Sequence, residues 1–164
     1  MKNIHRYKTQ VEWRGNSGKG TTDYRSYSRD HQISVGGKPV IPGSSDPSFR
    51  GDSARYTPED LLVSSLSACH MLWYLHLCAV NNVVVVDYTD NAEGEMAEND
   101  DGSGEFIKVI LRPRVTVAEA AMADKAQSLH REANRMCFIA RSVNFPVEHI
   151  PQIVCLENAA NGHA

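Results

Sequence analysis

The longest regular pattern of apolar residues in the chain lies between Thr57 and Val80. Apolar side chains recur there at steps of three and four residues, which is the spacing of one face of an α-helix. Few charged residues lie opposite them, and a helix that is apolar nearly all round is buried on most of its faces. We therefore expect the central helix of the molecule, or of a dimer, built around Leu61, Leu62, Leu66, Cys69, Trp73 and Leu77.

The two ends of this helix carry separate signals. Thr57 suits the N-cap, Pro58 suits the first helical position, and the two acidic residues that follow are favoured in the first turn by the helix dipole. An Asn-Asn pair follows Val80 and interrupts the apolar pattern. The sequence thus predicts a helix that begins at about Thr57 and ends at about Val80.

Strand-like segments lie on both sides of this helix. They alternate or are rich in β-branched residues, and they cover Tyr7–Trp13, Tyr24–Ile33, Val83–Glu93, Phe106–Val117 and Val147–Leu156. The glycine-rich turn at residues 15–20 joins the first two in a predicted hairpin. Residues 36–56 are rich in Gly, Pro, Ser and Asp, and we expect a long functional loop there.

A second helix is predicted for Ala118–Met136, with an apolar face formed by Ala121, Met122, Ala126, Leu129 and Ala133. A short helix is expected for Phe138–Val143. The order is then two strands, a loop, a long helix, two strands, a helix and a closing strand. This grouping predicts an α+β fold with an antiparallel sheet and helices on one side.

Charge and length limit the class of protein. The 164 residues suffice for one domain over residues 1–156, ahead of a polar tail at 157–164. A net charge of -3 with scattered basic residues argues against nucleic acid as the main partner. The polar amino terminus lacks a signal peptide, and the apolar run Met71–Val80 is too short to span a bilayer. We expect a cytoplasmic protein with no membrane partner.

The four cysteines direct attention to thiol chemistry. In a reducing compartment they are expected to be reduced, catalytic or buried rather than structural bridges. Their spacing fits no zinc template, so no metal or other cofactor is expected. A thiolate attacks peroxides to give a sulfenic acid, which a second thiol traps as a disulfide, and a nearby arginine stabilises the anion. Cys69 and Cys137, each in helix-like sequence, are the candidate pair.

The segment from Thr57 to Cys69, Thr-Pro-Glu-Asp-Leu-Leu-Val-Ser-Ser-Leu-Ser-Ala-Cys, resembles the helix start and peroxidatic cysteine of the OsmC/Ohr-like proteins, which are thiol-dependent hydroperoxide reductases. Cys137 falls where that family's resolving cysteine is expected, and the element order agrees up to about Leu156. Phe138 stands where the family commonly has proline, and residues 70–74 are bulkier than usual, so the chain resembles a divergent subgroup.

The resemblance implies roles for four residues. Cys69 would be the peroxidatic thiol, Cys137 the resolving thiol, and Glu59 the carboxylate that orients a catalytic arginine. Arg50, nine residues before Glu59, is the chosen arginine. Arg55 and Arg29 are the alternatives.

Helix geometry adds a constraint on these residues. Glu59 and Cys69 are ten residues apart in one helix, which corresponds to about 15 Å along its axis. Either Glu59 only starts the helix, or it serves the Cys69 of a second chain. The family's sites lie at a homodimer interface, so we expect an intertwined homodimer. The resemblance also implies an organic hydroperoxide as substrate and an external dithiol, such as a lipoyl-type dithiol, as reductant. The alternatives are a non-catalytic stress-response or small-molecule-binding protein and a cysteine hydrolase.

The remaining candidates are expected to be structural. His70 follows Cys69 directly, and neighbours on a helix diverge by about 100°, so a thiolate–imidazole pair is not expected. Cys78 and Cys155 are expected in the core, and the side chains of His76 and His130 on a helix surface or an interface. Trp73 and Tyr74 are expected in core or dimer packing, or in the wall of an apolar pocket.

Overall fold

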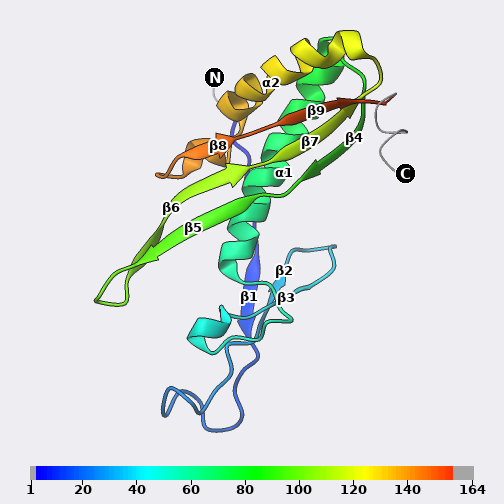
Figure 1. The fold of residues 1–164 in the computed structure, drawn as a ribbon. Coiled ribbons are helices and arrows are strands. Elements are labelled where there is room, and N and C mark those ends of the chain that lie inside the picture. Colours follow the sequence, from blue (N-terminus) through cyan, green and yellow to red (C-terminus); the bar gives the residue numbers. More distant parts are fainter. Residues whose placement is uncertain (1–2, 157–164) are drawn as a thin grey trace, which may run out of the picture. The chain divides into compact units, whose positions relative to one another are not determined.

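The computed structural model describes residues 3–156, which form two compact units, Met1–Leu61 and Leu62–Ala164 (Figure 1). Each unit is described by itself. The predicted polar tail, residues 157–164, lies outside the described residues. The expectation of one domain over residues 1–156 stays a prediction.

The first unit is a small antiparallel sheet with the strand order β1-β2-β3. The strands are β1 (Gln10–Trp13), β2 (His31–Ser34) and β3 (Ile41–Gly43). The predicted hairpin is confirmed, although its second strand is shorter than expected and begins only at His31. The predicted loop contains β3 and a 3-10 turn, Pro47–Phe49, in which the Asp46 carboxylate accepts a hydrogen bond from the Ser48 N–H.

Helix α1 covers Pro58–Val80, as the sequence predicts. Its start is fixed by two reciprocal hydrogen bonds, in which the Asp60 N–H donates to Thr57 Oγ1 (3.1 Å) and the Thr57 N–H donates to Asp60 Oδ2 (2.9 Å). Its end is followed by Asn82 in the left-handed conformation, with φ of 57°. These local signals suffice to place both ends of α1.

The burial of α1 differs from the prediction. Its fully buried residues recur every four positions and form a single face: Leu66, His70, Tyr74 and Cys78. Other apolar residues stay exposed within the chain, among them Leu72 (64%) and Val80 (61%). The helix is therefore buried on one face of the isolated chain, rather than on most faces.

The length of α1 also corrects the expectation that the apolar segment of this helix is too short to span a bilayer. Its 23 residues meet the length and hydropathy of a membrane span, whereas the sequence argument considered only Met71–Val80. Core helices of water-soluble proteins pass the same test, so the finding concerns length and composition alone.

The second unit holds six strands in two sheets. They are β4 (Val85–Asp90), β5 (Glu93–Glu98), β6 (Gly104–Leu111), β7 (Pro113–Val117), β8 (Val147–His149) and β9 (Gln152–Cys155), in the orders β4-β7-β9 and β5-β6-β8. The predicted strands Phe106–Val117 and Val147–Leu156 are thus each divided into two, whereas the predicted Val83–Glu93 corresponds to β4, and β5 begins only at its last residue. At one of these breaks the Arg112 N–H donates to Asp90 Oδ1 (2.7 Å) instead of to a strand partner.

The expectation of a purely antiparallel sheet is wrong for the closing strands. The pairs β4–β7 and β5–β6 are antiparallel, whereas β8 runs parallel to β6 and β9 runs parallel to β7. A helical crossover allows parallel pairing, and here α2 (Ala123–Met136) lies between β7 and β8 in the chain. Two short 3-10 turns, Ala120–Met122 and Ala140–Ser142, flank α2.

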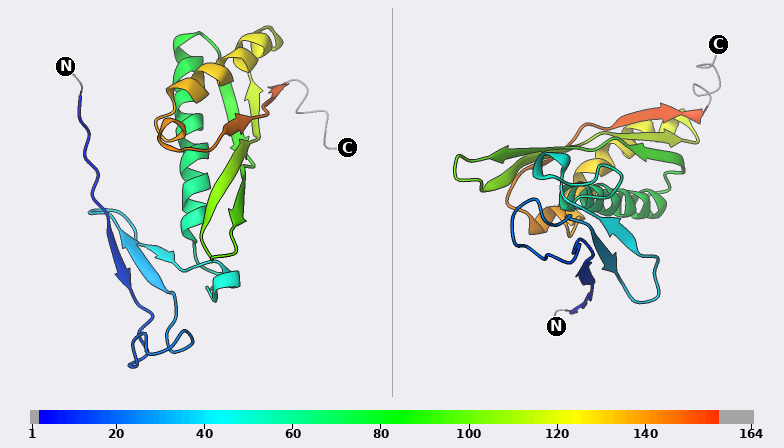
Figure 2. Two further views of the ribbon diagram at one scale, coloured as in Figure 1. Left: turned by 90° about the vertical axis from the view of Figure 1, so that its left-hand side faces the viewer. Right: turned by 90° about the horizontal axis from the view of Figure 1, so that it is seen from below.

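Both helices cover the same face of these strands (Figure 2). The main core joins α1, α2 and β7 through Tyr74, Cys78, Val83, Val115, Val117, Ala126, Leu129 and Ala133. The predicted apolar face of α2 is confirmed for Ala126, Leu129 and Ala133, but Ala121 precedes the helix and is exposed. A second core around Leu66, Val109 and Leu111 lies between α1 and β6.

Candidate functional site

The structure brings the Cys69 and Cys137 side chains together within the second unit. Cys69 lies on α1 and is half-buried, and Cys137 is the buried residue that directly follows α2. The two side chains are close enough that Cys69 is one of the causes that raise the pKa of Cys137, and both thiols are free. Two thiols from distant parts of the chain are therefore adjacent in the reduced form.

Cys137 is held as a protonated thiol. Burial, and then the neighbouring Cys69 thiol, raise the pKa of Cys137 above its usual range. Its Sγ also accepts the Ala140 N–H at 3.4 Å, from the 3-10 turn after α2. The pair thus combines a buried, protonated thiol with a more exposed one.

The other predicted site residues lie in the first unit. The Oε2 atom of Glu59 is buried and has no hydrogen-bond partner among residues 3–156. Arg50 is exposed, has a left-handed backbone (φ of 66°), and lies 5.9 Å from the centroid of the Tyr24 ring. Arg55 pairs with two carboxylates, those of Asp52 (3.2 Å) and Asp30 (3.6 Å).

Arg29 has a different environment from these two arginines. Its guanidinium lies 4.2 Å from the ring centroids of both Tyr24 and Tyr27, which is a cation–π arrangement. Its Nη1 donates to the Tyr27 carbonyl oxygen at 2.7 Å. Its Nη2 is buried and has no partner in the described part of the chain. Arg29 is thus the arginine that combines a fixed position with an unused donor.

A cluster of buried histidines beside Cys69 was not expected from the sequence. The Nε2 atom of His70 lies 3.0 Å from Nδ1 of His130, and the two rings are nearly parallel. The ring centroid of His149 is 5.6 Å from that of His70, and the Tyr74 ring stacks on His130 with centroids 3.9 Å apart. Burial lowers the pKa of His70 to about 4 and that of His130 to about 3.

The expectation that His130 lies on a surface or an interface is wrong. His130 is fully buried, because it belongs to the same face of α2 as Ala126 and Ala133. That i, i+4 spacing from Ala126 is the sequence signal that could have placed it. His76, by contrast, is exposed, as predicted, while Cys78 is buried and Cys155 packs against the main core.

The histidine cluster bears on the cysteine hydrolase alternative and on metal binding. Because one nitrogen of His70 is bonded to His130, the imidazole is directed into the core, and the cysteine hydrolase gains no support from it. Among residues 3–156 no group of three or more His, Cys, Asp or Glu side chains has the geometry to hold a metal ion.

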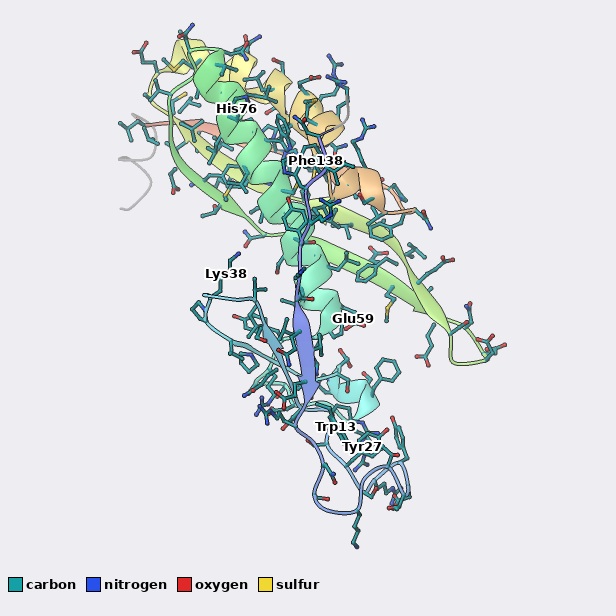
Figure 3. The ribbon with its side chains drawn as sticks, turned by 180° about the vertical axis from the view of Figure 1, so that it is seen from behind. Trp13, Tyr27, Lys38, Glu59, His76 and Phe138 are labelled. Carbon is teal, nitrogen blue, oxygen red and sulfur yellow. The ribbon has the colours of Figure 1, made fainter. Side chains whose placement is uncertain are left out.

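Aromatic side chains pack together in the two segments that follow Cys69 and Cys137. Trp73 and Phe138 pack edge to face, with ring centroids 5.6 Å apart and planes at 86°. Leu72, Trp73 and His76 line a shallow cavity of about 260 Å³. Figure 3 shows His76 on α1 and Phe138 near the end of α2.

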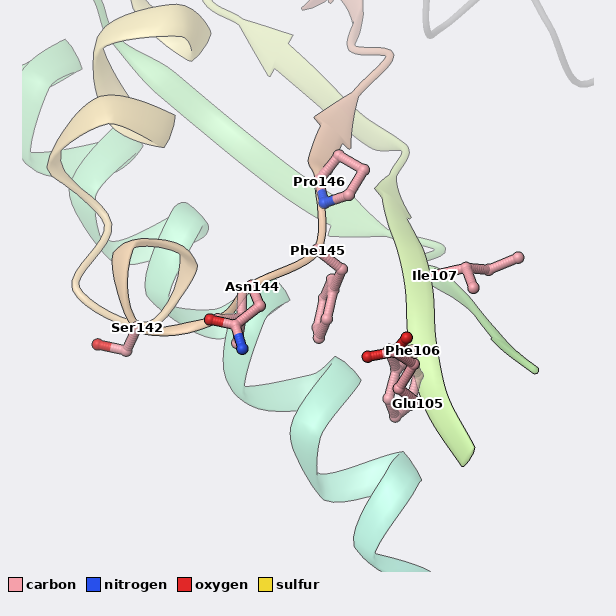
Figure 4. Close-up of a pocket in the computed structure, with 8 residues that line it drawn as sticks. Glu105, Phe106, Ile107, Ser142, Asn144, Phe145 and Pro146 are labelled. Carbon is pink, nitrogen blue, oxygen red and sulfur yellow. The ribbon is translucent and has the colours of Figure 1, made fainter. Parts of the chain in front are cut away.

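A larger cavity of about 530 Å³ lies between β6 and the segment before β8. The rings of Phe106 and Phe145 meet within it, with centroids 5.4 Å apart (Figure 4). Neither Cys69 nor Cys137 lines this cavity, so it is not the space next to the thiols.

Comparison with solved structures gives a consistent result. The chain is similar to an OsmC-like protein of unknown function from Vibrio cholerae, at 31% identity and a TM-score of 0.79 over 92% of this chain and 100% of that one. It also has the fold of organic hydroperoxide resistance proteins from Elizabethkingia anophelis (15% identity, TM-score 0.68, 94% and 99% covered) and Legionella pneumophila (14%, 0.68, 93% and 98%).

The sequence model of the OsmC-like proteins matches residues 51–150. No curated protein matches the chain. The matched residues include Glu59, Cys69 and Cys137, and they make up more than half of the chain. The chain therefore belongs to the OsmC-like protein family.

Proposed function

We propose that this protein is a thiol-dependent peroxidase that reduces organic hydroperoxides, or hydrogen peroxide, with Cys69 as the attacking residue. The observation that carries the proposal is the adjacency of the Cys69 and Cys137 side chains in their reduced form. The organic hydroperoxide resistance proteins with the same fold agree with this chemistry. Neither a metal nor an organic cofactor enters the reaction.

The reaction has two steps on the protein. The Cys69 thiolate attacks the distal peroxide oxygen, so that an S–O bond forms, the O–O bond breaks, and the alkoxide takes a proton to leave as an alcohol. The sulfur of Cys137 then attacks the sulfenic acid, so that the S–S bond forms and water leaves with the Cys137 proton. An external dithiol, such as a lipoyl-type dithiol, supplies the two electrons that restore both thiols.

Arg29 of a second copy of the chain is the arginine that we propose for the stabilisation of the Cys69 thiolate and of the charge on the leaving oxygen. Both the Nη2 of Arg29 and the Oε2 of Glu59 are buried without a partner in the described chain. A buried charged group without a partner is costly, and an arginine–carboxylate pair is the usual remedy. Glu59 is accordingly the orienting carboxylate, and Arg50 and Arg55 are the alternatives to be compared.

We also propose a homodimer. The exposed apolar residues of α1, such as Leu72 and Val80, support a surface covered by a second copy. The predicted cytoplasmic location belongs to the same proposal, because reducing conditions keep both thiols free between turnovers.

A thiol assay tests the function directly. The reduced protein is treated with cumene hydroperoxide and its free thiols are followed by mass spectrometry. We expect the rapid loss of two thiols as a Cys69–Cys137 disulfide, together with steady turnover when dihydrolipoamide is the reductant. Cys69→Ser should abolish both, whereas Cys155→Ser is the matched control and should retain both.

The alternatives give different results in the same assay. A non-catalytic binding protein keeps its thiols, and a cysteine hydrolase instead forms an acyl adduct on Cys69 with an activated ester. Full peroxidase activity in Cys69→Ser would contradict the proposal.

A further inference from the structure

Two contacts connect the helical segments that carry the thiols. One is the Cys69–Cys137 pair, and the other is the 3.0 Å contact between His70 Nε2 and His130 Nδ1. On α1 both contacts start from neighbouring residues, about 1.5 Å apart along the helix axis. Cys137 still follows the helical path of α2, because its N–H donates to the Ala133 carbonyl oxygen (2.9 Å), and it lies seven residues, or about two turns, after His130. The histidine contact therefore holds α2 against α1 beside Cys69, on the side of α2 that leads to Cys137.

The His130 ring is held in one orientation by residues of three elements. The ring is fully buried, its Nδ1 contacts His70, and its face stacks on Tyr74 with centroids 3.9 Å apart and planes within 12°. From β8, the His149 ring lies 5.6 Å from the His70 centroid and 6.3 Å from the His130 centroid. A shift of α2 along α1 would disturb the hydrogen bond and the stacking together.

Simple packing does not account for the histidine pair. His70 Nδ1 and His130 Nε2 are buried and lack partners among residues 3–156. Each of these nitrogens loses its hydration without a replacement, so apolar side chains of similar size would be more favourable for stability alone. Apolar side chains lack direction, however. A hydrogen bond has a narrow range of distance and angle, and it specifies one register between two helices where apolar packing tolerates several.

The register of the helices matters for the second step of the proposed reaction. A disulfide forms only within a narrow range of Cα separation and of the dihedral angle about the S–S bond. Cys137 is a buried thiol, so its attack depends on being placed beside the sulfenic acid in advance. Until the disulfide closes, a second peroxide can oxidise the sulfenic acid further to the sulfinic acid.

We propose that His70 and His130 are positioning residues for disulfide closure: their contact holds α1 and α2 in the register in which Cys137 traps the sulfenic acid of Cys69 before a second peroxide does. This inference rests on the proposed peroxidase function and adds no chemical step to it. Both histidines act through the helices that carry the thiols, not by contact with the peroxide.

The test separates the two steps of the reaction. Reduced protein is mixed with an equimolar amount of cumene hydroperoxide and quenched at intervals with dimedone and a thiol-alkylating reagent. Mass spectrometry then follows the sulfenic acid on Cys69 and the Cys69–Cys137 disulfide. In His130→Leu the sulfenic acid should form within about twofold of the parent rate, whereas closure should slow by at least about tenfold, because small misplacements of reacting groups have effects of this size. With excess peroxide this variant should accumulate sulfinic acid on Cys69.

Conservative variants distinguish positioning from a general loss of stability. The asparagine amide reaches the place of Nδ1 and can bond to His70, so His130→Asn should restore closure to within about threefold of the parent. Val115→Ala is the matched control, because it shortens a fully buried side chain of the main core on β7 and keeps both histidines. Its closure rate should equal that of the parent. If His130→Leu fails to fold, His70→Leu removes the same contact from α1, and His70→Gln, whose amide reaches the place of Nε2, is the corresponding rescue.

The outcomes separate this inference from the proposed function. Closure at the parent rate in the leucine variant would overturn the positioning role and leave the peroxidase intact. Equal slowing in His130→Asn and His130→Leu, or in Val115→Ala and His130→Leu, would also overturn it, because the effect would then not depend on the hydrogen bond. If the parent itself reacts with peroxide at neither thiol, the proposed function fails.

Discussion

His70 Nε2 lies 3.0 Å from His130 Nδ1, and this contact joins α1 to α2 in the interior of the second unit. A single proton is shared in such a contact, because one nitrogen must donate and the other must accept. Whichever ring donates, the outer nitrogens, His70 Nδ1 and His130 Nε2, are buried and lack partners among residues 3–156. The cluster therefore favours neutral imidazoles, and protonation of either ring is unfavourable.

This histidine pair predicts that the protein loses stability in mild acid. The folded-state pKa of His70 is lowered to about 4 and that of His130 to about 3, against about 6.5 in the unfolded chain. Below pH 6.5 the unfolded state binds more protons, so the stabilisation is complete above that pH and is lost as the pH falls toward 4. Urea unfolding at pH 8, 6, 5 and 4 should show a loss of up to about 3 kcal/mol for each histidine by pH 4, because one pKa unit corresponds to about 1.4 kcal/mol.

A matched pair of variants identifies the source of the acid effect. His130→Leu removes one buried titrating group, and its stability should fall less steeply between pH 6.5 and 4 than that of the parent. His76→Gln removes an exposed histidine and should retain the parent slope. Equal slopes in the parent and His130→Leu would show that the cluster is not responsible.

Gly94 is predicted to be intolerant of any side chain. A Cβ at this position of β5 would lie 2.7 Å from both Phe106 Cε1 and Val63 Cγ2. Because these atoms belong to the packing between α1 and β6, Gly94→Ala should lower the free energy of unfolding by about 1–3 kcal/mol. Gly36→Ala is the control, since no atom lies within 4 Å of its added Cβ, and chemical denaturation should find it neutral.

The choice of arginine can be decided by kinetics. Arg29→Lys keeps the charge but removes the planar guanidinium that contacts the rings of Tyr24 and Tyr27, and kcat/KM for cumene hydroperoxide should fall by about 100-fold. Arg50→Lys should stay within about threefold of the parent, because the Arg50 side chain is exposed. The reverse order of effects would favour Arg50, the arginine chosen from the sequence.

Loss of the Cys137 thiol should make the oxidation of Cys69 irreversible. Without a neighbouring sulfur to trap it, the sulfenic acid of Cys69 in Cys137→Ser persists and is oxidised further to the sulfinic acid. Mass spectrometry after treatment with excess peroxide should therefore find a gain of two oxygen atoms on Cys69. Cys155→Ser is the control and should form the Cys69–Cys137 disulfide like the parent. If Cys137→Ser and Cys155→Ser both oxidise Cys69 without forming a disulfide, a resolving role for Cys137 is contradicted.

Local signals in the sequence were sufficient for the helices. Thr57, Pro58 and the acidic first turn place the start of α1, and the Asn-Asn pair places its end, because caps act within a few residues. Residues 118–122 were assigned to α2 but form a bend and a 3-10 turn, since helix propensity alone marks boundaries poorly.

Features that depend on distant contacts were not predictable in the same way. The breaks after Asp90 and at Arg112 depend on a side chain–backbone hydrogen bond across the sheet. The parallel pairing of β8 and β9 depends on the crossover, and β3 depends on pairing with β2. The adjacency of Cys69 and Cys137 followed from a family resemblance, whereas the contact between His70 and His130 joins residues 60 positions apart and had no local signal.

The position of Cys137 immediately after α2 has a consequence for the order of events in catalysis. The carbonyl groups at the end of a helix carry a partial negative charge, which opposes a second negative charge on a sulfur beside them. Cys137 is therefore a poor nucleophile, and it reacts only once the oxidised sulfur of Cys69 offers a strong electrophile. Trapping should be slower than the initial attack on peroxide, so that during a sudden excess of oxidant the sulfenic acid accumulates before the disulfide does.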